Sequence, residues 1–269
     1  MPFQTVGEYL REVSLSRRKH VVVEGSSDRR TWEVWADRHA LGNQLTFHEV
    51  AELHVPYELL VSNSLGAGRR AEVLGVALEA TAQGIDMKCI ADRDTGELVH
   101  ELTLPVLLWT DYPALESYSF CPKVIDAANR LNFRERLPKG EAVVALLSGP
   151  MAELFARRCE NVNLRNPNFA RGVTSVANGF SFDATVATGV TLIDSTRVDS
   201  LLCGSDARGW AHGHDISALI FFAFQGEFSG SGTSGVKGVE AALVAAMHSS
   251  GELDESPLAR RLAGWIKKI

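Results

Sequence analysis

The sequence predicts an α/β protein: a doubly wound, mainly parallel sheet with a helical C-terminal appendage. Two mostly apolar runs of strand length carry this prediction, Val21–Val23 and Met87–Ala91, because runs that are apolar on both faces are typical of buried parallel strands. Both runs end abruptly in an acid, at Glu24 and at Asp92. Segments of helical periodicity separate the runs, as expected when helices connect parallel strands.

The elements of the first half follow in regular order. Thr5 and Glu8 have the spacing of a capping box and open the first expected helix. After the first strand, Ser27 or Asp28 can cap a second helix, for which Gly42 is the expected stop. The expected elements are helices over about 5–18, 28–41 and 69–84, and strands over 21–24, 45–50, 87–91 and 103–109.

Beyond residue 110 the pattern changes, and we place a soft domain boundary near residue 120. This divides the chain into 1–120, the predicted catalytic domain, and 121–269, a mainly helical region that completes the site or binds a partner. The Asn-rich segment 161–179 is expected to be a loop, and the β-branched segment 181–194 a short hairpin. Helices are expected over 123–131, 141–158, 215–224, 236–247 and 258–266.

The composition is that of an ordinary globular protein, with 45% hydrophobic and 22% charged residues. No apolar run is long enough for a transmembrane helix, so no membrane association is expected. The start lacks the pattern of a signal peptide, and the four cysteines lie far apart, which predicts a reducing, cytoplasmic location. A net charge of −6 does not favour a protein coated in nucleic acid, although a local basic groove is compatible with it.

The acids at the strand ends are the first candidate site. Glu24, Asp92 and Asp94 would all face the crevice at the carboxyl ends of the strands, where open α/β sheets bind their ligands. Residues two apart on an extended segment point the same way, so the two aspartates could chelate one ion or hold two adjacent ions. Three carboxylates in one crevice repel one another unless a cation lies among them, and a hard divalent metal is the natural occupant. The alternative is a pair of solvated acidic turns.

Further candidates follow the fourth expected strand. Glu116, with Asp111 as a weaker candidate, could complete the metal shell, or could be an acid at a helix start. His212 and His214 precede an expected helix; His214 could shuttle a proton or contact a scissile phosphate, or both could belong to a capped helix start. The remaining predicted site residues are the substrate-binding pair Arg69 and Lys88.

The order of these motifs resembles a Toprim domain, the catalytic unit of topoisomerases, bacterial primases and the overcoming-lysogenization-defect nucleases. The resemblance lies in Val22–Asp28, in Gly66–Gly68 leading a helix, and in Ile90–Asp94. Thr110–Tyr118 resembles a Toprim-like family of prokaryotic defence proteins, which includes the nuclease subunit of the PARIS antiphage system. The resemblance covers about residues 20–120, and because the motifs are short it depends on their order and context.

The resemblance implies a Toprim-like fold and a metal-dependent nuclease. It places the family's glutamate at Glu24, its two metal-binding aspartates at Asp92 and Asp94, and its later glutamate at Glu116, with Mg²⁺ or Mn²⁺ as the cofactor. It also implies a toxin-like effector of antiphage defence that acts on RNA, tRNA included, or on DNA. The expected partners are a separate ATPase of the ABC type that restrains and activates the nuclease, and a second copy of the chain in a homodimer.

The residues themselves leave one alternative open. The same crevice could bind a metal or a phosphate group only as a non-catalytic scaffold in a larger assembly. No tyrosine is placed as a topoisomerase mechanism requires, so hydrolysis is preferred over strand passage or nucleotide polymerisation.

Overall fold

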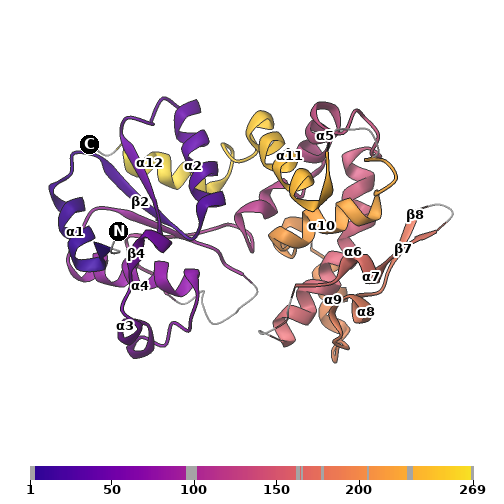
Figure 1. Cartoon of the computed structure of the whole chain (residues 1–269), viewed down its shortest axis with the longest axis horizontal. Coiled ribbons are helices and arrows are strands. Elements are labelled where there is room, and N and C mark those ends of the chain that lie inside the picture. Colours follow the sequence, from indigo (N-terminus) through magenta and orange to yellow (C-terminus); the bar gives the residue numbers. More distant parts are fainter. Residues whose placement is uncertain are drawn as a thin grey trace. The chain divides into compact units, whose positions relative to one another are not determined.

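A computed structural model describes residues 4–94, 102–161, 164, 166–176, 179–204, 206–228 and 233–267 (Figure 1). These residues group into two compact units, which are described separately. Unit 1 comprises 4–93, 102–111 and 256–267; unit 2 comprises Asp94 and the described part of 112–255. The division expected near residue 120 differs from this grouping, because the C-terminal residues belong to unit 1 and the helical region is inserted within it.

Unit 1 is an α/β fold around a four-stranded parallel sheet, as the sequence predicts. The strands are β2 (Lys19–Val23), β3 (Leu45–Glu49), β5 (Lys88–Ala91) and β6 (Leu107–Trp109), in the spatial order β3-β2-β5-β6. Every neighbouring pair is parallel, and Val22 is aligned with His48 on one side and with Cys89 on the other. Val21, Val22 and Val23 are completely buried, which explains why the run is apolar on both faces.

The path through the sheet reverses between β2 and β5. Helix α2 (Ser26–Arg38) leads from β2 to β3, and α4 (Arg69–Ala82) then leads back past β2 to β5. Figure 1 shows α2 and α12 (Pro257–Ile266) on one side of β2, and α1 (Val6–Leu15) and α4 on the other. Such a reversal is a topological switch point, and the carboxyl ends of its two strands flank the ligand crevice of open α/β sheets.

The helix starts expected in unit 1 are present, and one expected helix stop is not. The Thr5–Glu8 capping box is confirmed, since the Thr5 N–H donates to the Glu8 carboxylate over 2.9 Å. Helix α2 begins directly after Gly25, whose N–H donates to the Asp28 carboxylate. The expected stop at Gly42 is wrong: α2 ends at Arg38, because Ala40 adopts a left-handed φ of 56°.

The remaining elements are β1 (Gln4–Thr5), which pairs with β4 (Leu53–His54), the 3₁₀ turn η1 (Val50–Glu52) and α3 (Tyr57–Ser62).

Unit 2 is mainly helical in its described part. Its longest helices are α6 and α11, and α11 packs along α5 and α10. The helices are α5 (Pro122–Leu131), α6 (Gly140–Glu160), α7 (Phe169–Gly172), α8 (Ala184–Thr188), α9 (Thr196–Leu202), α10 (Gly213–Ala223) and α11 (Gly235–Ser250), with 3₁₀ turns η3 (Leu115–Ser119) and η4 (Ala207–Gly209).

The hairpin of unit 2 lies earlier than expected. Strand β7 (Val173–Val176) lies inside the segment expected to be a loop, and it pairs antiparallel with β8 (Gly179–Phe182), which begins at the last residue of that segment. The expected hairpin over 181–194 is wrong, because the Asp183 carboxylate accepts the Val186 N–H and caps helix α8 there. Residues 162, 163, 165, 177 and 178 of the expected loop lie outside the described residues. No helix in the described ranges is long and apolar enough to cross a membrane.

Candidate functional site

Glu24 and Asp92 meet at the switch point of the sheet. Glu24 directly follows β2, and Asp92 directly follows β5, the neighbouring parallel strand. The Glu24 carboxylate accepts a hydrogen bond from the Asp92 backbone N–H, with 2.8 Å from Oε1 to N. The two predicted residues that end the apolar runs are thus brought together, and the Glu24 side chain is fixed by the backbone of the next strand.

The backbone beside this pair is held by two residues that were not predicted. The Arg93 N–H donates to the Thr110 hydroxyl over 3.0 Å, and an Nη1–H of Arg70 approaches the Arg93 carbonyl oxygen at 3.5 Å. Thr110 follows β6 and is 1% exposed, while Arg70 is in the first turn of α4. Their signal in the sequence was their place at the end of a strand and the start of a helix. Beside them, a Cβ added to Gly25 would meet no atom within 4 Å, so the turn after Glu24 leaves room for a ligand.

Asp94 does not continue the extended chain. Its φ of 52° lies in the left-handed region, and its N–H donates to the Pro113 carbonyl oxygen over 2.8 Å. The expectation that Asp92 and Asp94 point the same way from one extended segment is therefore wrong, since regular alternation ends before Asp94. Asp94 belongs to unit 2, where its carboxylate Oδ1 lies 3.9 Å from Nε2 of His212.

Glu116 lies in η3 of unit 2, against the start of helix α10. A Cβ built on Gly213 would lie 2.5 Å from Oε2 of Glu116, so only glycine fits this close approach. The Ser117 hydroxyl donates to the Ala211 carbonyl oxygen over 2.6 Å and fixes the same contact. Burial raises the pKa of the Glu116 carboxyl, while the nearby imidazole of His214 acts to lower it.

His212 and His214 flank that glycine. His212 precedes α10 without a side-chain capping bond, and burial lowers its pKa. His214 is exposed in the first turn. The next residue, Asp215, is 3% exposed and forms an ion pair with Arg158. The arginine donates from Nη2 to Oδ1 over 2.8 Å and from Nε to Oδ2 over 3.1 Å. This buried ion pair was missed, because its partners are far apart in the sequence; Asp215 was seen only as a first-turn acid.

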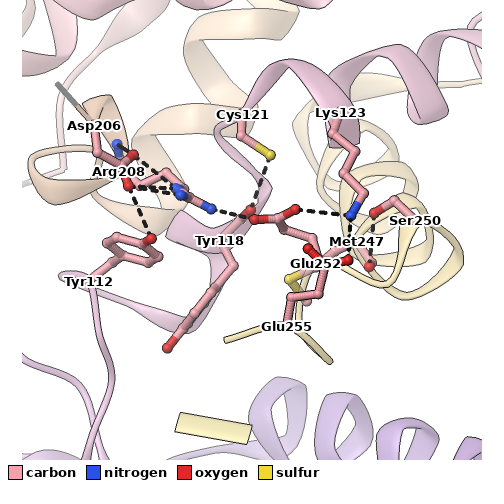
Figure 2. Close-up of polar contacts among 10 residues, drawn as sticks. All are labelled: Tyr112, Tyr118, Cys121, Lys123, Asp206, Arg208, Met247, Ser250, Glu252 and Glu255. Atoms are coloured by element: carbon pink, nitrogen blue, oxygen red, sulfur yellow. Dashed lines mark hydrogen bonds and ion pairs between the residues drawn. The ribbon is translucent and has the colours of Figure 1, made fainter. Parts of the chain in front are cut away.

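A polar network holds the loop that leads into this cluster (Figure 2). The Arg208 guanidinium binds the Asp206 carboxylate at 2.8 Å, lies 4.7 Å from the ring centre of Tyr112, and also donates to Glu252. Tyr112 donates in turn to Asp206 over 3.1 Å, and Lys123 lies 3.5 Å from Glu252. The segments around residues 112, 206–208 and 252 are therefore fastened to one another within unit 2.

Two predicted substrate-binding residues have other partners. Lys88 is the first residue of β5, so it lies at the amino end of the strand and not in the crevice at the carboxyl end. Its ammonium donates to the Pro105 carbonyl oxygen and lies 5.5 Å from the ring centre of Trp265, and its role in substrate binding stays a prediction. Arg69 starts α4 and pairs with Glu72 at 2.7 Å; its role in substrate binding stays a prediction.

Asp111, the weaker metal candidate, fastens helix α12. Its carboxylate accepts the Leu258 N–H over 3.0 Å and an Nη2–H of Arg261 over 3.1 Å. Both oxygens are engaged in holding the C-terminal helix on unit 1, which explains the acid at this position without a metal.

A metal at the switch point would have few protein ligands. Among the described residues, no three His, Cys, Asp or Glu side chains are grouped so as to hold a metal ion. Mg²⁺ commonly binds through one or two carboxylates and keeps several waters or substrate oxygens, unlike a closed structural site. The adjacent acids Glu24 and Asp92 fit that kind of site. Convergence with Asp94 and Glu116, which belong to the other unit, stays a prediction.

Comparison with protein families and with curated proteins gave no match. The resemblance to Toprim nucleases therefore rests on the order of the residues and on the parallel sheet that carries them.

Proposed function

We propose that the chain is a divalent-metal-dependent nuclease with a Toprim-like α/β unit, which hydrolyses phosphodiester bonds of RNA, tRNA included, or of DNA. The observation that carries the proposal is the hydrogen bond that joins the Glu24 side chain to the Asp92 backbone across the switch point. Two acids at that position make binding of an anionic phosphate unfavourable, unless a cation lies between them and the substrate.

Glu24 and Asp92 would hold the metal. When bound, Mg²⁺ or Mn²⁺ supplies stabilisation of negative charge on the phosphate and lowers the pKa of a bound water. The protein's own contribution is orientation: the Asp92 N–H donates to Oε1 of Glu24 and fixes the carboxylate at the end of β2. The space beside Gly25 lets a phosphate approach the backbone.

We assign Asp94 and Glu116 to the same reaction from the resemblance, and His214 from its place beside Glu116 at the start of α10. A buried carboxyl with a raised pKa, as in Glu116, keeps its proton to a higher pH than an exposed one, and this suits a group that protonates a leaving oxygen. The exposed imidazole of His214 beside it is suited to exchange that proton with solvent. The ABC-type ATPase as restraining partner also rests on the resemblance.

The test is cleavage of total RNA and of DNA by the purified full-length chain, with Mg²⁺ or Mn²⁺, alone and with the neighbouring gene product. Glu24→Gln and Asp92→Asn should each lower the cleavage rate by about 100-fold or more, as loss of metal ligands does. The matched control is Glu58→Gln, an exposed acid in the first turn of α3, which should leave the rate unchanged.

Wild-type cleavage that survives both substitutions would contradict the proposal. Absence of cleavage of either nucleic acid, with both metals and the partner present, would favour the scaffold alternative.

A further inference from the structure

His20 on β2 and His48 on β3 form a part-buried pair. His20 is 5% exposed, and its Nδ1 lies 3.0 Å from Nε2 of His48, which is a hydrogen bond between the two imidazoles. The rings are stacked, with centres 5.2 Å apart and planes 5° from parallel. The ring of Tyr9 covers the pair edge-on, with its centre 5.0 Å from that of His48.

The hydrogen bond between the two imidazoles limits how many protons the pair can bind. In the pair, one imidazole N–H donates and the other nitrogen accepts. A first added proton can be carried on an outer nitrogen, and His48 Nδ1 has the Glu52 carboxylate at 3.8 Å. A second added proton places an N–H on all four ring nitrogens, so the two facing nitrogens become donors only 3.0 Å apart. His20 then also carries an N–H at Nε2, a buried atom with no hydrogen-bond partner in the described structure.

The charged neighbours do not remove this limit. Burial is the main cause that lowers the pKa of His20 and of His48, and each is also affected by charges of both signs. The titratable and charged groups around the pair are Tyr9 and Glu12 on α1, Arg18 before β2, Arg29 on α2 and Glu52 on η1. Two acids and two arginines largely offset one another, so two imidazolium ions in the pair have no net compensation.

We propose that the His20–His48 pair makes the junction of β2 and β3 a proton-sensitive latch, closed with at most one proton on the pair and opened by the second. The unfolded chain binds two protons on these residues below about pH 6.5, whereas the folded pair binds no more than one. Because the unfolded state then binds more protons, stability falls as the pH falls. Glu24 directly follows β2, so acidification weakens the strand that positions the candidate site.

The latch can be tested without any assay of activity. The full-length chain is unfolded with urea in the presence of a chelator at pH 7.5 and pH 5.5, and tryptophan fluorescence is followed, since Trp32 and Trp35 are buried in unit 1. One excluded proton should lower the folded-to-unfolded ratio about tenfold between these two values. In His48→Gln, whose amide can keep one bond to His20, most of that tenfold difference should disappear.

The matched control is His54→Gln, an exposed histidine in the same unit, which should retain the wild-type pH dependence. His212 is unchanged in all three proteins, so its own contribution in this range cancels from the comparison. Equal pH dependence in wild type and His48→Gln would overturn the latch.

A measurement on the wild type covers the case in which His48→Gln does not fold. NMR titration of the imidazole nitrogens should show that the pair takes up its second proton well below pH 6.5. Two rings that both titrate near 6.5 in folded protein would overturn the proposal.

Discussion

The acids of the two units are held in different ways. In unit 1, Glu24 is fixed by a backbone N–H of the neighbouring strand, so the fold itself orients the carboxylate. In unit 2, Glu116 lies in the contact between η3 and α10, and Asp215 below it is locked in a buried ion pair with Arg158. An acid held by backbone can be changed without much cost to the fold, whereas acids held by packed side chains are part of the structure.

The largest expected effect of this difference is at the buried ion pair. Arg158→Met leaves the Asp215 carboxylate, 3% exposed, without its main cationic partner, and removal of one member of a buried pair typically costs about 3–5 kcal/mol. Urea unfolding should show this loss. As a control, Arg69→Met breaks a pair whose arginine side chain is 55% exposed and should cost less than about 1 kcal/mol. Equal losses in the two variants would mean that the buried pair does not hold unit 2 together.

The next effect is at the contact between Gly213 and Glu116. In Gly213→Ala the new methyl would lie 2.5 Å from Oε2 of Glu116, so the carboxylate or the helix must move, at about 1–3 kcal/mol. Gly209→Ala, where a Cβ meets nothing within 4 Å, is the matched control and should change stability by less than about 0.5 kcal/mol. Both are measured by urea unfolding.

A double substitution sharpens this result. In a Glu116→Ala background most of the displaced atoms are absent, so Gly213→Ala should cost clearly less there. The same cost in both backgrounds would show that the strain does not come from the Glu116 carboxylate.

The sequence predicted the unit 1 site better than the unit 2 cluster for a physical reason. Apolar runs that end in acid reveal both strands and their carboxyl ends, and the order of the connecting helices then places Glu24 beside Asp92. By the same logic Lys88 lies at the opposite end of β5 from Asp92, because it begins the strand that Asp92 follows. What could not be predicted depends on partners distant in sequence: the left-handed turn at Asp94 is fixed by Pro113, and Asp215 by Arg158.

The hairpin of unit 2 was misplaced for a related reason. The β-branched residues after Asp183 favour a strand by composition, yet the capping bond of Asp183 starts a helix there. Phe182, just before it, pairs with Val173 across the hairpin, so the true strand ends where the expected one begins. Local composition therefore predicted a hairpin in the right part of the chain, and the capping bond of Asp183 determined where its second strand ends.

The smallest expected effect on stability is at Glu24. In Glu24→Gln the side-chain amide oxygen can still accept a hydrogen bond from the Asp92 N–H, and one negative charge beside Asp92 is removed. The free energy of unfolding, measured with urea, should therefore change by less than about 1 kcal/mol, in either direction. Glu24→Leu removes the acceptor as well and should cost about 1–3 kcal/mol, because the part-buried N–H of Asp92 then loses this bond. The difference between the two substitutions measures the hydrogen bond, and the first alone measures the charge.

If Glu24→Gln destabilises the protein as much as Glu24→Leu, the negative charge itself supports the fold, and Glu24 would be a structural acid like Asp215. If Glu24→Gln is neutral for stability and abolishes cleavage, the charge serves the ligand, which is the result expected of a metal-binding carboxylate oriented by the sheet.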